Sequence, residues 1–373
     1  MRVLVTSHAC VVEANRRKLD LLARKDDVEL ALICPRTVRR ELGTYRAPRA
    51  SPAGYRIEAL PALYASHTYR FFYLGAGRAI RRLAPDVVHV EEEPWSLAAW
   101  QAVRACRRLA GTRVLCFTWQ NLPVRYGWPH EAIRRRVLAA ADAAIAGNAE
   151  AAGLLREGGF EGPVHVLPQF GVDPERYAPR DESPLRRELG LQGLVAGFAG
   201  RLVPEKGVEL LLDALAGLAG EWSVLVVGRG PLRDGLAARL AKPPFAGRSA
   251  LVEAVPRDQM PRYLNAMDLL ALPSRAAAHW KEQFGHVLIE AMACQVPVVG
   301  STCGAIPEVV GDAGMVVPEG QADALREAIE RLMGLEEERA ELGRRGRQRV
   351  LERYTDACIA DATHAIYREV LGR

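Results

Sequence analysis

The chain has 373 residues, of which 49% are hydrophobic and 25% are charged, and its formal net charge is +5. This length suggests two domains, because a domain usually has about 100 to 200 residues, and it excludes a small scaffold that depends on disulfides. The seven cysteines are far apart and none has metal-ligand spacing, so we expect reduced thiols in a cytoplasm and no zinc site.

Six short apolar runs in the first half of the chain predict the strands of one sheet. They cover residues 2–6, 28–34, 86–90, 114–118, 143–146 and 164–167, and helical patterns such as 16–24, 72–83, 97–109 and 131–140 lie between them. This alternation is typical of βαβ units around a parallel sheet. We therefore predict a Rossmann-like, doubly wound domain over residues 1–175.

A polar passage with prolines at residues 171–183 predicts an interdomain linker, after which the alternation starts again. The second series of predicted strands covers residues 194–199, 223–227, 250–253, 269–272, 296–300 and 315–317. It predicts a second Rossmann-like domain over residues 176–355, while the helix at 356–373 is able to return to the first domain. Because ligands bind beyond the carboxyl ends of parallel strands, we expect the two domains to face each other across a cleft.

The loop after the predicted strand 194–199 carries two cations close to glycines. Arg201 can grip phosphate oxygens with its planar fork, Lys206 can add a point charge, and Gly200 and Gly207 let the backbone approach a ligand. A diphosphate is the ligand that suits this loop. The alternative is a surface loop in which the cations pair with the nearby Glu205 and Glu209.

Two glutamates flank the start of a predicted helix near Gly285. The first amides of a helix and its positive dipole end suit a pyrophosphate. Glu290, more than one turn further along, is placed to accept ribose hydroxyls, and Glu282 to accept hydroxyls of a sugar. The alternative is an exposed Glu282 and a salt-bridged Glu290.

Three segments together resemble the retaining glycosyltransferases of family 4, which have the GT-B fold. They are GRLVPEKG at 200–207, EQFGHVLIE at 282–290 and PVVGSTCGAIPEVV at 297–310. The resemblance implies that Arg201 and Lys206 bind the donor diphosphate and act in catalysis with Glu282, which contacts the donor sugar. It also implies a ribose contact for Glu290 and a base-binding loop at 252–258. Around these lie the other members of the predicted donor-binding set, namely Gly200, Val255, Phe284, Gly285 and His286.

The first half departs from the family pattern. Ser7-His8-Ala9-Cys10 stands where a glycine-rich loop is common, and Trp119-Gln120-Asn121 stands where a histidine usually contacts the donor sugar. Gln120 or Asn121 is a candidate neutral substitute for that histidine. His8 is a more distant candidate, and its alternative is an ordinary core or surface histidine.

Acceptor contacts are predicted from two further segments. Glu91, Glu92 and Glu93 follow the predicted strand 86–90, where they either bind hydroxyls or an amine of the acceptor or form a solvated turn. Aromatic residues at 69–73 and the arginines at 78, 81 and 82 form either a surface for a lipid-linked acceptor or an ordinarily packed helix.

The prediction for function is transfer of a hexose from a nucleoside diphosphate sugar, by default a UDP-sugar, to a hydroxyl of a small-molecule, glycan or lipid-linked acceptor. The nucleotide-sugar is a co-substrate, and we expect no metal, no cofactor and no nucleic acid partner. We expect a cytoplasmic protein, with peripheral contact at the inner face of the membrane left open. The alternatives are a nucleotide-sugar 2-epimerase of the same fold and a noncatalytic nucleotide-sugar-binding protein.

Overall fold

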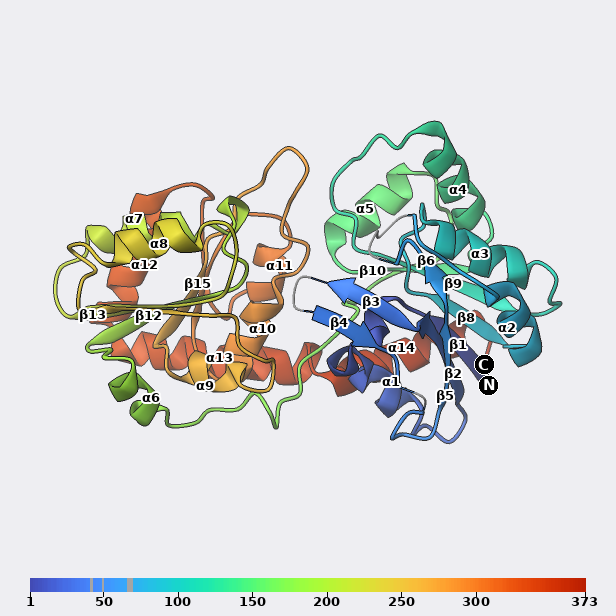
Figure 1. The fold of residues 1–373 in the computed structure, drawn as a ribbon, viewed down its shortest axis with the longest axis horizontal. Helices are drawn as coiled ribbons and strands as arrows, with labels where there is room; N and C mark the ends of the chain where they lie inside the picture. Colours follow the sequence, from blue (N-terminus) through green and yellow to red (C-terminus); the bar gives the residue numbers. More distant parts are fainter. Residues whose placement is uncertain (41–42, 49, 66–69) are drawn as a thin grey trace. The chain divides into compact units, whose positions relative to one another are not determined.

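Two parallel sheets, each covered by helices, organise the computed structural model, which describes residues 1–40, 43–48, 50–65 and 70–373 (Figure 1). The chain divides into two compact units: unit 1 contains residues 1–171 and 356–373, and unit 2 contains residues 172–355. The predicted α/β class with two Rossmann-like sheets is confirmed. In the described part of the chain, no helix combines the length and the apolar character needed to cross a bilayer.

Unit 1 is built on a seven-stranded parallel sheet. From edge to edge its strands are β11 (Val164–Val166), β10 (Ala143–Ala146), β9 (Arg113–Thr118), β8 (Val87–Val90), β1 (Arg2–Thr6), β2 (Glu29–Pro35) and β5 (Arg56–Leu60). The chain runs outward in one direction from β1 and in the other from β8, so the order of the strands reverses between these two. Six strands lie where the sequence predicted them, and β5 was not predicted.

Helices cover both faces of this sheet, and two short antiparallel pairs extend its loops. The helices are η1 (Ala9–Val11), η2 (Glu13–Arg16), α1 (Arg17–Leu22), α2 (Ala76–Leu83), α3 (Leu97–Cys106), α4 (Trp128–Leu138), α5 (Ala149–Glu157) and α14 (Asp356–Val370). The pairs are β3 (Thr37–Arg40) with β4 (Gly43–Arg46), and β6 (Ala62–Leu63) with β7 (Phe72–Tyr73). Ser96 and Asn148 are the N-cap residues of α3 and α5, because each side chain accepts a hydrogen bond from a backbone amide of the first turn.

One helix was predicted with the wrong start. The segment 72–83 was expected to be a single helix, but Phe72 and Tyr73 form β7 and α2 begins at Ala76, after Gly75 in the left-handed conformation. Phe71 and Tyr73 are buried in the core, so they cannot form the predicted aromatic surface, and Tyr69 lies outside the described residues.

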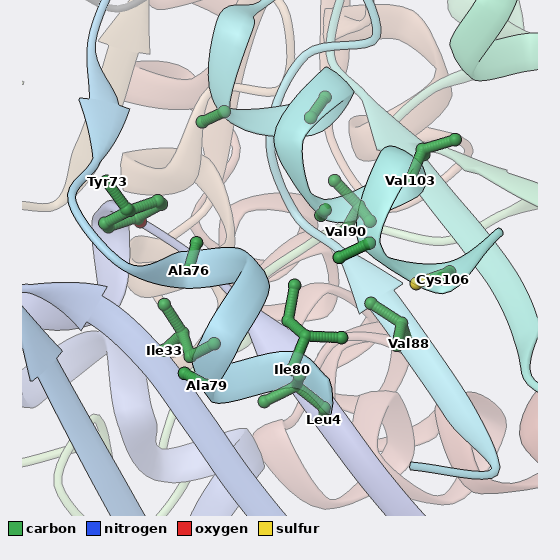
Figure 2. Close-up of a cluster of buried hydrophobic side chains, with 14 of the residues drawn as sticks. Leu4, Ile33, Tyr73, Ala76, Ala79, Ile80, Val88, Val90, Val103 and Cys106 are labelled. Carbon is green, nitrogen blue, oxygen red and sulfur yellow. The ribbon is translucent and has the colours of Figure 1, made fainter. Parts of the chain in front are cut away.

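The core of unit 1 lies on both faces of the sheet. On one face, Ala76, Ile80 and Val103 from α2 and α3 pack against Leu4 and Val88 of the strands (Figure 2). On the other face, α1 and the final helix α14 pack together over the strands. Residues at the end of the chain therefore complete the core of unit 1.

Unit 2 is built on a six-stranded parallel sheet. Its strands, from edge to edge, are β14 (Ser249–Val252), β13 (Trp222–Val227), β12 (Leu194–Ala199), β15 (Leu269–Leu272), β16 (Val298–Ser301) and β17 (Met315–Val317). Its helices are α6 (Ser183–Glu188), η3 (Pro204–Lys206), α7 (Val208–Ala216), α8 (Arg233–Leu240), α9 (Met260–Asn265), α10 (His286–Ala293), α11 (Ile306–Val310), α12 (Ala322–Gly334) and α13 (Glu336–Arg353). All six strands were predicted, and the order of the strands reverses between β12 and β15.

Candidate functional site

The reversal of strand order in unit 2 brings the two predicted donor-binding loops together. β12 and β15 are direct neighbours, with Ala196 paired to Leu269 and Gly197 to Leu270. The loop with Arg201 and Lys206 follows β12, and the loop with Glu282 follows β15. Because the carboxyl ends of adjacent parallel strands lie at the same edge of a sheet, both loops meet where open α/β sheets form their binding crevice.

Lys206 and Glu282 form an ion pair at this edge. Lys206 Nζ lies 2.5 Å from Glu282 Oε2, and the two side chains are only 15% and 8% exposed. Ser274 Oγ donates a hydrogen bond of 3.0 Å to the same carboxylate oxygen, and the ring of Trp280 lies 5.1 Å from Nζ. The predicted alternatives, an exposed Glu282 and a Lys206 paired with Glu205 or Glu209, are therefore wrong.

Two glycines allow these loops to approach each other closely. Gly207 has φ +72°, and a Cβ there would lie 2.0 Å from the carbonyl oxygen of Pro273. Gly304 has φ +58°, and a Cβ there would lie 2.1 Å from the carbonyl oxygen of Glu282. Only glycine suits both positions, since each combines a left-handed backbone with a contact that no side chain fits. The glycines thereby fix the backbone on both sides of the Lys206–Glu282 pair.

Arg201 is exposed and lies in the same loop as Lys206. Its loop is joined to the loop after β13, because Gly200 N donates to the carbonyl oxygen of Val227 at 3.0 Å and Leu202 N donates to that of Arg229 at 2.8 Å. Within the described ranges, the Arg201 guanidinium has no ion-pair or hydrogen-bond partner. A fixed backbone with an uncommitted guanidinium is suited to gripping an anion.

The helix α10 begins at His286, directly after Gly285, where the sequence predicted a helix start. Gly285 has φ +80° and no side chain that could cap the helix, so α10 presents its first amide groups at the loop that holds Glu282. The Phe284 ring is buried and lies 5.0 Å from the His286 ring and 5.6 Å from the Tyr354 ring. Burial lowers the pKa of His286 to about 3, with contributions from Arg257 and Lys206, so this histidine is neutral at physiological pH.

Glu290 lies in α10 and is linked to the loop after β14. Its Oε1 lies 3.3 Å from the hydroxyl of Tyr177 and 3.6 Å from a guanidinium nitrogen of Arg257. Burial raises the pKa of Glu290, although Arg257 and Tyr177 oppose that shift. Val255, the predicted contact of the base, precedes Arg257 in the same loop, so the predicted ribose and base contacts belong to one connected structure. Sequence reasoning did not identify Tyr177 and Arg257 as partners of Glu290, although Arg257 lies in the predicted base-binding loop 252–258.

The three glutamates after β8 are held inside unit 1, at the reversal between β1 and β8. Glu91 and Glu92 are 3% and 1% exposed, so the predicted solvated turn is wrong. Glu91 pairs with the buried Lys18 and accepts a hydrogen bond of 3.0 Å from Gln169 Nε2. These partners satisfy its charge, and the Lys18 ammonium holds its pKa below the usual range despite the effect of burial.

His8 is attached to Glu92 by two contacts. The backbone amide of His8 donates to Glu92 Oε1 at 2.6 Å, and His8 Nδ1 lies 2.5 Å from Glu92 Oε2. The hydroxyl of Tyr73 donates a third hydrogen bond to Glu92, at 3.1 Å. The imidazole of His8 is one-quarter exposed, so a buried carboxylate orients a histidine at the carboxyl end of β1.

The segment that replaces the family histidine is used in local hydrogen bonds. Gln120 Nε2 donates to the carbonyl oxygen of Leu122 at 2.5 Å, and Asn121 Nδ2 donates to Glu150 Oε2 at 3.1 Å. Asn121 is 4% exposed, whereas Gln120 is half-buried. A donor-sugar contact for either side chain stays a prediction.

A cavity of about 220 Å³ lies in unit 1 next to Gln120. Trp95 and Tyr126 contribute stacked rings 4.7 Å apart, and the guanidinium of Arg134 donates two hydrogen bonds to Glu131 on the same wall. Aromatic rings beside polar groups suit a ligand with both apolar faces and hydroxyls. Sequence reasoning missed this cavity, although Trp95 stands two positions after the last of the three glutamates.

Two family models match the chain. Residues 16–169 match a model described as "Glycosyl transferase 4-like domain", and residues 181–349 match one described as "Glycosyl transferases group 1". A D-inositol 3-phosphate glycosyltransferase of Segniliparus rotundus is 32% identical over 219 residues, 56% of this chain and 47% of that protein. A 2-deoxystreptamine glucosyltransferase of Streptomyces kanamyceticus is 31% identical over 225 residues, 56% and 55% of the two chains. The chain thus spans about half the length of the curated relatives it matches.

Solved structures with low sequence identity have the same fold. Sucrose-phosphate synthase from Thermosynechococcus elongatus aligns with a TM-score of 0.76 at 19% identity and covers 100% of this chain and 99% of its own. The Anabaena protein HepE in complex with UDP aligns with a TM-score of 0.77 at 18% identity, with 99% of both chains covered.

Proposed function

Because the chain is a glycosyltransferase of the GT-B type, we propose that it transfers a hexose from a nucleoside diphosphate sugar to an acceptor hydroxyl, with retention of configuration at the anomeric carbon. The role of unit 2 in this proposal is to bind the donor. Retention and membership of family 4 are part of the proposal and rest on the resemblance of residues 200–207 and 282–290 to that family.

The proposal depends mainly on one observation, the Lys206–Glu282 ion pair, which joins the loop that carries the exposed Arg201 to the loop that leads into α10. The two loops follow β12 and β15, the neighbouring strands at the reversal of strand order in unit 2. Two cations and a helix N-terminus stabilise negative charge that develops on a departing diphosphate. This arrangement supplies the positive charge from the protein itself, so the proposal assigns no metal and no cofactor.

In the proposed reaction, the bond between the anomeric carbon and the diphosphate oxygen breaks, and its electron pair stays with the diphosphate. The acceptor oxygen then forms a bond to the anomeric carbon on the same face of the sugar. Its proton passes to an oxygen of the departing phosphate. Arg201 and Lys206 bind the diphosphate, Glu282 accepts a hydroxyl of the sugar, and Glu290 accepts hydroxyls of the ribose.

The donor is proposed to be a UDP-hexose. Support for uridine comes from the fold, because HepE, which shares it, is known in complex with UDP and with UDP-glucose. The acceptor is proposed to bind unit 1, where Trp95, Tyr126 and Gln120 line the cavity. A small molecule, a glycan or a lipid-linked sugar all present the hydroxyl that this reaction needs.

Product analysis tests the proposal. The purified protein is incubated with UDP-, GDP- and ADP-hexoses, each with and without a panel of acceptors, and the products are examined by mass spectrometry and by NMR at the anomeric position. We expect a new glycoside with the anomeric configuration of the donor, only when an acceptor is present.

Three outcomes would contradict the proposal. A 2-epimer formed from the donor alone would identify an epimerase. Tight donor binding without any product across the panel would identify a nucleotide-sugar-binding protein. A product with inverted configuration would contradict retention while leaving the transfer itself in place.

A further inference from the structure

The outer layer of unit 1 carries an unusual excess of arginine. The helices α2, α3 and α4, together with the turn after α3, contain nine arginines, three in each of the segments 76–83, 97–108 and 128–138. The same segments contain one carboxylate, Glu131. The inner faces of α2 and α3 pack on the sheet through small and apolar side chains (Figure 2), so the arginines are left for the outer face.

Five of these arginines gather around one tryptophan. A groove of about 280 Å³ is lined by Trp100 with Arg81, Arg104 and Arg108, and a second groove of about 200 Å³ is lined by Trp100 with Arg104, Arg107 and Arg136. The guanidinium carbon of Arg104 lies 5.2 Å from the centre of the Trp100 ring. We call these six residues the Trp100 arginine cluster. Its two grooves share Trp100 and Arg104. The helices that carry these residues, α2, α3 and α4, are neighbours in unit 1 (Figure 1).

The cations of the cluster are not neutralised by the protein. All five arginines are exposed, and in the part of the chain that the structure describes none of them has an ion-pair partner. Other arginines of the same helices do have ion-pair partners: Arg82 pairs with Glu58, while Arg134 and Arg135 pair with Glu131. Like charges held close together repel each other and attract anions. The cluster is therefore a surface that an external anionic partner would stabilise.

We propose that the Trp100 arginine cluster docks the protein on an anionic phospholipid surface. The cations are spread over three helices and two shallow grooves, which suits a plane of many phosphates better than one bound ion. Guanidinium groups bind phosphate oxygens through two parallel hydrogen bonds, and a partly buried indole is the side chain that prefers the boundary between lipid and water. The inference is independent of the proposed transfer reaction.

Sedimentation with vesicles tests the docking. The full chain is mixed with vesicles of phosphatidylcholine alone and with vesicles of phosphatidylcholine and phosphatidylglycerol in equal parts, at low and at high salt. Binding is expected only to the anionic vesicles and is expected to weaken at high salt, since screening limits these attractions to about 8 Å at physiological ionic strength. The variant Arg104→Gln/Arg107→Gln/Arg108→Gln should bind on the order of 100-fold more weakly, because each basic residue near such a surface contributes about 1 kcal/mol.

A matched control separates the cluster from net charge. The variant Arg176→Gln/Arg187→Gln/Arg353→Gln removes three exposed arginines from unit 2 and should bind the anionic vesicles like the unchanged protein. Thermal unfolding of both triple variants checks that each is folded.

The proposal is overturned if both triple variants lose binding equally, or if neutral vesicles bind as well as anionic ones. Two competing ligands would also overturn it, if either saturates the cluster at concentrations at which anionic vesicles do not bind. Saturation by inorganic pyrophosphate would identify a soluble anion as the partner, and saturation by a short RNA would identify a nucleic acid. Because none of the substituted arginines belongs to the proposed donor site, sugar transfer to a soluble acceptor should be unchanged in the first triple variant. Failure of the docking is thereby distinguished from failure of the proposed function.

Discussion

Lys206 Nζ lies 2.5 Å from Glu282 Oε2, although 76 positions of the chain separate the two residues. The pair joins a cation proposed to hold the diphosphate to a carboxylate proposed to hold the sugar. A donor diphosphate would therefore compete with Glu282 for the ammonium group, whereas the exposed Arg201 has no competitor among the described residues. The two cations should consequently respond differently to substitution.

Replacing either cation with alanine should reduce turnover at saturating donor by on the order of 100-fold or more, because each is proposed to stabilise charge on the leaving diphosphate. Stability should distinguish the two variants. Lys206→Ala leaves the buried Glu282 carboxylate without its cation and should lower the unfolding temperature, while Arg201→Ala removes an exposed side chain and should leave it unchanged. Steady-state rates and thermal unfolding measure both effects, and near-normal turnover in both variants would contradict the assignment.

Glu282→Gln should separate nucleotide binding from sugar transfer. The change keeps the shape of the side chain but removes the charge that competes for Lys206. Free UDP should then bind as tightly as before, or up to about 10-fold more tightly, since a hydrogen bond to a charged group contributes roughly 1.5–3 kcal/mol and 1.4 kcal/mol is tenfold in affinity. The transfer rate should fall, because the sugar loses its charged acceptor. Calorimetry and product assays measure the two quantities, and a parallel loss of both would show that Glu282 serves only to hold the loop.

Gly207→Ala should destabilise unit 2 and reduce donor binding. A Cβ at this position would lie 2.0 Å from the Pro273 carbonyl oxygen, and the backbone has φ +72°. The left-handed backbone alone costs about 1–3 kcal/mol for an alanine, and the clash adds to that penalty. Gly220→Ala is the matched control, because Gly220 has φ +86° but no atom within 4 Å of the added Cβ. Denaturant unfolding should show the larger loss for Gly207→Ala, and equal losses would mean that the close approach of the two loops is unimportant.

Glu93 should make the stability of unit 1 depend on pH. It accepts hydrogen bonds from Thr118 Oγ1 at 2.6 Å and from Trp119 N at 3.0 Å, and burial raises its pKa from 4.5 to about 7. Between these two values the folded state holds a proton that the unfolded state releases, so the free energy of unfolding falls as the pH rises from 4.5 to about 7. Above that range Glu93 is ionised in both states, so it lowers the free energy of unfolding no further. The glutamine in Glu93→Gln cannot lose a proton. Above neutral pH this variant should therefore have a free energy of unfolding higher than that of the unchanged protein by on the order of 1–3 kcal/mol, measured by denaturant unfolding. In acid the two free energies should be similar. A gain that is the same at every pH would contradict this origin.

The sequence predicted the elements of unit 2 better than their contacts. Each strand there is a short run of mainly apolar residues, so all six could be located, whereas the edge strand β5 of unit 1 has the sequence RIEAL and lacks such a run. Phe72 and Tyr73 were assigned to α2 because an apolar run alone does not separate a strand from the start of a helix. The Lys206–Glu282 contact requires that β12 and β15 are neighbours, and that order cannot be read along the chain.

The solvated turn predicted as one alternative for the glutamates after β8 was wrong for a similar reason, while their contact with an acceptor stays a prediction. Three adjacent carboxylates look solvated when only their neighbours in sequence are considered. The groups that satisfy Glu91 are Lys18 and Gln169, which lie 73 and 78 positions away. The predicted penalty for burying these charges was correct in principle, but the fold supplies distant partners that offset it.

Tyr126 should affect the acceptor and not the donor. Its ring stacks on Trp95 at 4.7 Å and lines the cavity proposed to receive the acceptor. Tyr126→Ala should raise the KM for the acceptor by about 10-fold, because loss of an aromatic contact in a pocket is worth roughly 0.5–1.5 kcal/mol beyond the area it buries. The KM for the donor should not change, since the proposed reaction assigns the donor to Arg201, Lys206, Glu282 and Glu290, which belong to unit 2. Trp128→Ala is a suitable control, because Trp128 begins α4, is 83% exposed and does not line the cavity. A rise in the donor KM instead, or an equal effect of the control, would show that the acceptor does not bind in this cavity.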